Sequence, residues 1–237
     1  MNKKIKKSIK QEFEAPKPKR KQEFFRSIPT PSIGYFEFVC SQVAYIRKSA
    51  WVLSALIFTI ALIGAECLKK DMLLCISAFA PLLALSLVTE SGRSEFYGMA
   101  EFELPAKFSL KSVVLARLGI LGVFNFILIC VLIPFAFMPR DSTVLQTGVY
   151  IICPYLLTAF GGLWTVRKVH QKEAFYLCAG IATSVSVGNV MIYQTVPAFY
   201  AERSFAWWIV ALIILIAGTA NQCYQTIKQT EELAWNL

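Results

Sequence analysis

Apolar residues along this chain fall into six long blocks separated by short polar connections. The blocks cover residues 51–67, 72–89, 113–138, 147–166, 174–197 and 205–223. A helix of about 20 mainly apolar residues is long enough to cross a hydrocarbon core roughly 30 Å thick. The pattern therefore predicts an all-α, polytopic protein with six transmembrane helices, located in the cell (plasma) membrane.

Two segments of different character precede the first block. Residues 1–32 are rich in Lys, Glu and Pro, a composition typical of a disordered chain. In the next segment one mainly apolar helix face would carry Tyr35, Phe38, Val39, Gln42, Val43 and Ile46. We expect an interfacial amphipathic elbow helix at 33–50, a six-helix transmembrane domain at 51–223 and a cytoplasmic tail at 224–237.

The distribution of charge predicts the orientation. The first 48 residues carry twelve Lys or Arg and four Glu, a net charge of +8 out of the chain's +9. With the amino terminus inside, the inner loops carry Arg93, Lys107, Lys111, Arg167, Lys168 and Lys172, whereas the outer loops carry Lys69, Lys70, Arg140 and Arg203. An excess of basic residues marks cytoplasmic segments, so both termini are expected in the cytoplasm. Because a membrane span follows the basic arm directly, anionic lipid is favoured over nucleic acid as its partner.

Composition and motifs argue against catalysis, nucleotide binding or metal binding by this chain itself. The chain is 56% hydrophobic and 16% charged, against roughly 45–50% and about 25% in soluble domains. Its seven cysteines are scattered without a Cys-x-x-Cys pair, and His170 is its one histidine, in a predicted loop. Neither a phosphate-binding loop nor a Gly-x-Gly-x-x-Gly motif occurs. We therefore expect no enzyme, no cofactor and no metal site.

Among the amides within the predicted spans, Asn125, Asn189 and Gln194 are the candidate intramembrane contacts, and Asn221 invites the same comparison. Amide side chains hydrogen-bond across membrane helices, so bonds between helices are the favoured interpretation and contact with a substrate is the alternative. No Asp, Glu, Lys or Arg lies at mid-depth in a span. Proton relays and ion-driven carriers usually place an ionisable residue there, so this pattern argues against an autonomous ion-coupled transporter.

A charged, amphipathic segment at 93–117 separates the second and third spans. Acidic residues alternate with apolar ones up to Pro105, which disfavours helical geometry in the residue before it. A short helix at 94–104 would present Glu95, Tyr97, Met99, Glu101, Phe102, Glu103 and Leu104 to a cytoplasmic partner. The alternative is a solvated loop on the lipid headgroups.

The order of residues in this segment resembles a known loop. Gly98-Met99-Ala100-Glu101-Phe102-Glu103, then Pro105, then Phe108-Ser109-Leu110, an apolar run and Ala116-Arg117-Leu118 is similar to the cytoplasmic loop of type-2 ABC exporter permeases. The likeness is detailed only over 90–118, while six spans, inside termini and an elbow helix match in architecture. The family often carries a re-entrant helical pair between the fifth and sixth spans. Here only 198–204 remains, unless 188–199 turns within the membrane.

The resemblance implies a membrane permease-like subunit of a bacterial ABC transporter. A separate ATPase would dock on loop 90–112, and a second permease chain would complete a homo- or hetero-dimer. The alternative is a non-transporting membrane scaffold or regulatory subunit that recruits a cytoplasmic partner.

Overall fold

The computed structural model describes residues 34–67, 72–91, 110–137, 143–169, 173–200 and 202–235. In these ranges the chain forms seven α-helices and two 3-10 turns, and no strand. They are α3 (Tyr35–Tyr45), α4 (Lys48–Cys67), α5 (Met72–Ser91), α8 (Leu110–Phe137), α9 (Val144–Lys168), α10 (Glu173–Thr195), η1 (Pro197–Tyr200), η2 (Glu202–Ser204) and α11 (Phe205–Trp235). The prediction of an all-helical chain is confirmed for this part of the sequence.

Residues 1–38 and 39–237 form two separate units. In the described part of the first unit, the backbone N–H of Gly34 donates to Oε2 of Glu37 (3.3 Å) at the start of α3. A helix is present at 35–45, and its location in the membrane interface stays a prediction. The predicted disordered arm at 1–32 lies outside the described residues.

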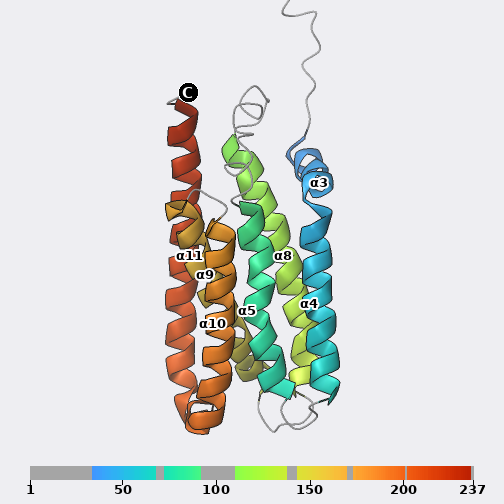
Figure 1. Ribbon diagram of the computed structural model, residues 1–237, viewed down its shortest axis with the longest axis vertical. Helices are drawn as coiled ribbons and strands as arrows, with labels where there is room; N and C mark the ends of the chain where they lie inside the picture. Colours follow the sequence, from blue (N-terminus) through green and yellow to red (C-terminus); the bar gives the residue numbers. More distant parts are fainter. Residues whose placement is uncertain are drawn as a thin grey trace, which may run out of the picture. The chain divides into compact units, whose positions relative to one another are not determined.

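Six helices of the second unit are long and apolar enough to cross a membrane: Lys48–Cys67, Met72–Glu90, Ser112–Ala136, Val144–Lys168, Glu173–Thr195 and Phe205–Thr226. They correspond to the six predicted blocks and indicate a multi-pass membrane protein. Successive helices alternate in direction (Figure 1). The sixth helix continues beyond residue 223 to Trp235, because neither Gly nor Pro interrupts it there.

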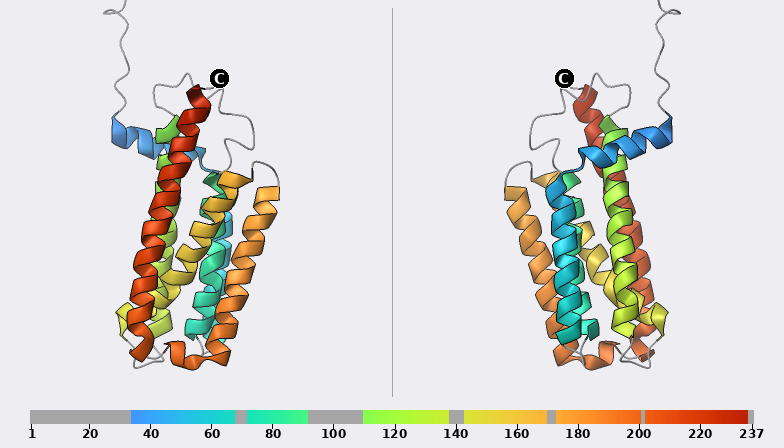
Figure 2. Two further views of the ribbon diagram at one scale, coloured as in Figure 1. Left: turned by 90° about the vertical axis from the view of Figure 1, so that its left-hand side faces the viewer. Right: turned by 90° about the vertical axis from the view of Figure 1, so that its right-hand side faces the viewer.

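Helices α5 and α9 form the centre of this unit. In the most apolar stretch of each of these two helices, 61% of the residues are buried. The corresponding share is 28% in α4 and α8, 17% in α10 and 6% in α11. The central pair contacts α4, α8, α10 and α11, which surround it (Figure 2). The four outer helices therefore present most of their apolar surface away from the protein.

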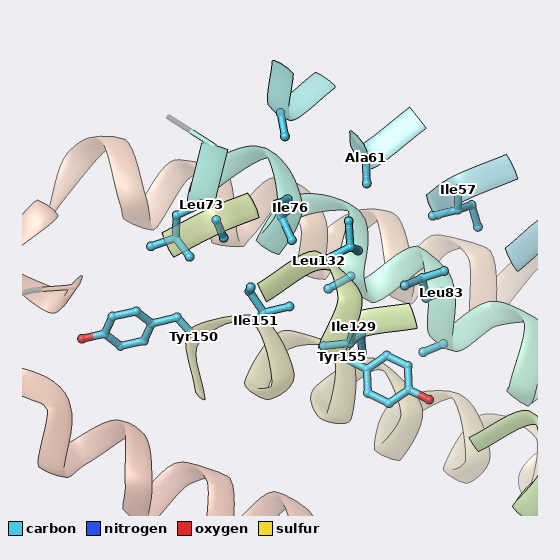
Figure 3. Packing of buried hydrophobic residues seen from close by; sticks show 14 of the residues in the cluster. Ile57, Ala61, Leu73, Ile76, Leu83, Ile129, Leu132, Tyr150, Ile151 and Tyr155 are labelled. Atoms are coloured by element: carbon cyan, nitrogen blue, oxygen red, sulfur yellow. The ribbon is translucent and has the colours of Figure 1, made fainter. Parts of the chain in front are cut away.

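The larger buried cluster joins four helices. Ile76 of α5, Leu132 of α8 and Ile151 of α9 meet in it, with Ile57 and Ala61 of α4 on one side (Figure 3). A second cluster nearer the other end contains Ile46, Leu87, Val114, Leu163 and Cys178, among others. These two clusters fix the positions of the helices that carry the buried polar groups.

Local sequence explains several helix features. Thr143 caps α9, accepting at Oγ1 from the backbone N–H of Gln146 (3.4 Å). Helices α5, α8 and α9 continue through Pro81, Pro134 and Pro154, which membrane helices tolerate. Helix α10 is unbroken from Glu173 to Thr195, so the residues before 196 do not form a re-entrant turn.

Candidate functional site

The predicted docking residues lie outside the described part of the chain. These are Glu95, Tyr97, Met99, Glu101, Phe102, Glu103 and Leu104, all within 92–109. Their flanks are described: α5 ends at Ser91 and α8 begins at Leu110, at the end of the bundle where α11 also terminates (Figure 1). Glu90, one residue before the end of α5, is only 5% exposed. The docking assignment thus stays a prediction, with its position along the bundle defined by these flanks.

A buried polar cluster joins α4, α5 and α8. The hydroxyl of Ser54 donates to Oδ1 of Asn125 (3.2 Å), and its oxygen lies 2.8 Å from Oγ of Ser86. Nδ2 of Asn125 in turn donates to Oγ of Ser86 (3.1 Å) and to the carbonyl oxygen of Leu83 (3.1 Å). All three polar side chains are fully buried. Because both ends of the Asn125 amide have partners on other helices, the group connects helices without a ligand.

A second polar cluster joins α10 to α5 and η1. Nδ2 of Asn189 donates to Oγ of Ser77 (3.0 Å), and Oδ1 of Asn189 accepts from the hydroxyl of Tyr200. The hydroxyl of Ser77 in turn donates to the carbonyl oxygen of Leu74 (3.1 Å). One turn away, Ser186 donates to the carbonyl oxygen of Ala78. The hydrogen-bonded chain Tyr200–Asn189–Ser77 thus ties the turn after α10 to the central helix α5.

Tyr200, at one end of this hydrogen-bonded chain, lies among three other aromatic rings. We call Tyr150, Tyr193, Tyr200 and Trp208 the aromatic cluster. The Tyr200 ring lies 5.1 Å from Tyr150, 5.0 Å from Tyr193 and 5.3 Å from Trp208 between centroids, and Tyr150 lies 5.1 Å from Trp208. Three of the four pairs meet edge to face, the arrangement that aromatic rings prefer. The rings are in contact with one another, so the cluster is a filled core and not a cage.

Hydrogen bonds fix the edges of the aromatic cluster. Nε2 of Gln146 donates to the hydroxyl of Tyr150 (2.9 Å), and Nε1 of Trp208 donates to the carbonyl oxygen of Phe199 (2.8 Å). Burial, together with the neighbouring Tyr193 and Tyr150, raises the pKa of Tyr200 to about 12. The Tyr200 phenol is therefore protonated at neutral pH, as it must be to donate to Asn189.

The three amides predicted as intramembrane contacts have different surroundings. Asn125 and Asn189 are buried and bond to other helices, in separate clusters. Gln194 is exposed on α10 and belongs to neither. Sequence reasoning missed Ser77, Ser86, Tyr200 and Trp208. Aromatic residues recur in every span and serine in several, and only the folded arrangement shows which of them meet the two amides.

Within the described ranges no group of three His, Cys, Asp or Glu side chains is close enough to hold a metal ion. His170 lies outside these ranges. Cys40, Cys67, Cys75, Cys130, Cys153, Cys178 and Cys223 are all free thiols.

No family model, no curated protein and no solved structure matches this chain.

Proposed function

We propose that this chain is a membrane permease-like subunit of an ABC transporter, energised by a separate ATPase that docks on the loop at 90–112. The observation that carries the proposal is the position of that loop. It connects the central helix α5 to α8, so a force applied to it would act on one of the two most buried helices of the bundle. A loop attached to a lipid-exposed outer helix would not transmit the movement of a soluble partner directly to the centre of the bundle.

The charge pattern supports a cytoplasmic location for this end. Helix α9 finishes there with Arg167 and Lys168, and Nζ of Lys168 lies 4.7 Å from the centre of the exposed Trp164 ring. Basic residues next to an aromatic residue are typical of a cytoplasmic membrane boundary. The elbow helix and the basic arm before it are assigned to the same side, against anionic lipid.

A second permease chain fits the weak burial of the outer helices. Helix α11 exposes Trp207, Val210, Ile213 and Ile214 by half or more of their surface. Lipid covers such a face in a monomer, and a partner helix of the same kind covers it in a dimer. The oligomer is part of the proposal through the resemblance to the exporter family.

The alternative function is a non-transporting scaffold or regulatory subunit that recruits a cytoplasmic protein through the same loop. Within the described residues the buried asparagines Asn125 and Asn189 bond to protein groups through both their oxygen and their nitrogen. Their use as links between helices favours the scaffold over a permease that binds a polar substrate at these two amides. An apolar or amphipathic substrate would not need these amides and stays compatible with a permease.

The test is co-purification from the native membrane with the chain tagged at one terminus. Glu101→Lys with Glu103→Lys is expected to remove an ATPase subunit from the purified complex, because docking depends on these carboxylates. Glu173→Lys reverses an exposed charge at the start of α10, at the same end of the bundle, and is the matched control.

Three results are distinguishable by mass spectrometry. Loss of an ATPase in the double variant, with retention in the control, supports the permease. A different cytoplasmic protein that is lost in the same way supports the scaffold. A partner set identical in all three proteins overturns docking on this loop.

A further inference from the structure

Three rings of the aromatic cluster, Tyr193, Tyr200 and Trp208, are the part of the α10–α11 segment that enters the large buried core. Among the described residues from 173 to 235, that core contains Tyr200, with Tyr193 and Trp208 packed against it. The rest of the core comes from α4, α5, α8 and α9. At this end, therefore, the outer pair α10–α11 is held to the central pair by rings and by the Asn189–Ser77 hydrogen bond, with Tyr200 bonded to the same amide.

A second attachment lies towards the opposite end of the same helices. Cys178 of α10 is buried in the smaller cluster, where its thiol faces the carbonyl oxygen of Gly162 at 3.7 Å. Cys223 of α11 packs against that cluster. Along the contact between the α10–α11 pair and the central helices, these two separated places thus differ in the kind of contact that they make.

The two attachments differ in the contacts that would be lost if the helices separated there. Apolar helix surfaces gain little from contact with each other in a membrane, because lipid tails replace protein side chains. The end with the aromatic cluster is joined to α5 and α9 by directional contacts. These are the Asn189–Ser77 and Ser186–Ala78 hydrogen bonds and the edge-to-face contacts of Tyr150 with Tyr200 and Trp208. Directional contacts of this kind weaken steeply when their geometry changes. Closed and separated arrangements of this end are therefore distinct from each other.

We propose that the aromatic cluster and the Tyr200–Asn189–Ser77 chain form a releasable latch that closes this end of the bundle. Release separates η1 and the adjacent ends of α10 and α11 from α5 and α9, while the attachment around Cys178 persists. The proposal goes beyond the proposed function and needs no ATPase, because it concerns an equilibrium of the chain alone.

Two native cysteines report on the two attachments. Cys153 of α9 is 3% exposed, and its thiol faces the carbonyl oxygen of Trp208 at 3.7 Å, so release of α11 uncovers it. Cys178 is 2% exposed and belongs to the attachment that persists. Cys67, at the end of α4, is exposed and serves as the reference for reagent access.

The experiment measures alkylation of each cysteine by N-ethylmaleimide in the purified full chain in lipid nanodiscs, by quantitative peptide mass spectrometry. Tyr200→Phe removes the hydroxyl that holds the Asn189 amide in place, and Ser77→Ala removes the partner through which Asn189 bonds to α5. Loss of one hydrogen bond of ordinary strength predicts a rise of roughly two- to tenfold in the Cys153 rate in either variant. The Cys178 and Cys67 rates are expected to stay at their wild-type values.

Tyr224→Phe is the matched control, since it removes the hydroxyl of an exposed tyrosine on α11. It should leave all three rates unchanged. An equal rise at Cys153 and Cys178 would mean that the whole bundle has loosened, and it would overturn the latch. An unchanged Cys153 rate in both Tyr200→Phe and Ser77→Ala would overturn it as well.

Discussion

At the scale of single residues, the two buried asparagines show how polar groups are accommodated inside a largely apolar bundle. Each amide bonds through both its oxygen and its nitrogen: Asn125 to groups on α4 and α5, Asn189 to Ser77 and Tyr200. An amide is the group that sequence reasoning can flag, because leaving it unpaired in lipid is costly. Its partners are set by tertiary packing, which is why Gln194 drew the same prediction and lies exposed.

The Tyr200 hydroxyl gives a prediction on pH. Its pKa is raised from 10.0 to about 12 by burial first and by Tyr193 and Tyr150 next, so the neutral phenol is favoured in the folded chain. Stability from this group is therefore fully present below pH 10 and is lost between about pH 10 and about pH 12. The thermal midpoint, followed by tryptophan fluorescence in detergent, should fall more steeply above pH 10 in the wild type than in Tyr200→Phe.

Tyr224→Phe serves as the control here too and should follow the wild-type curve. The prediction would be wrong if the difference between wild type and Tyr200→Phe stayed constant up to pH 12.

At the scale of elements, the sequence predicts which segments are helices far better than which helices are central. The six apolar blocks match six helices to within a few residues at most ends. In contrast, the burial of α5 and α9 does not follow from their hydrophobicity. Lipid and protein core are equally apolar, so a lipid-facing helix and a central helix have similar compositions. Small residues such as Gly162, which allow close approach, carry more of that information.

The contact between the central helices gives a prediction on packing. A Cβ atom at Gly162 of α9 would lie 2.7 Å and 2.9 Å from the two methyl groups of Val88 on α5. Val88 is 1% exposed, so it has little space to move into. Gly162→Ala should therefore destabilise the protein by about 1–3 kcal/mol, the usual range for an overpacked core. The shift in thermal midpoint in detergent measures it.

Gly180→Ala on α10 is the matched control. A Cβ there meets nothing within 4 Å, and alanine favours the helix, so the midpoint should stay or rise slightly. Adding Val88→Ala to Gly162→Ala should recover part of the loss, because it removes the two clashing methyl groups. Equal midpoints for the Gly162 and Gly180 variants would contradict the close α5–α9 contact.

At the scale of the whole second unit, the two proposed sites lie at opposite ends of the same central helix. Helix α5 leads at its carboxyl end into the docking loop, and nearer its amino end Ser77 receives the hydrogen bond from Asn189 (Figure 1). Pro81 lies between the two places. A proline removes one backbone hydrogen bond from the helix, so bending is easier there than elsewhere along α5.

This arrangement gives a prediction that joins the two proposals. If the chain is a permease, binding of ATP to the docked ATPase should change the alkylation rate of Cys153 by roughly fivefold or more, a typical coupling between distant sites. Cys178 should keep its rate, because its attachment does not belong to the latch. The measurement compares the purified complex with and without a non-hydrolysable ATP analogue, in wild type and in Glu101→Lys with Glu103→Lys.

The double variant separates the possible failures. It should abolish the nucleotide effect while leaving the Cys153 rate of the chain alone unchanged, since the latch does not depend on those carboxylates. A nucleotide effect that persists in the double variant would contradict docking through Glu101 and Glu103. Identical Cys153 rates with and without nucleotide, in a complex that retains its ATPase, would mean that α5 does not connect the two ends. The latch would then be an independent closure of the bundle, and the scaffold function would be favoured over transport.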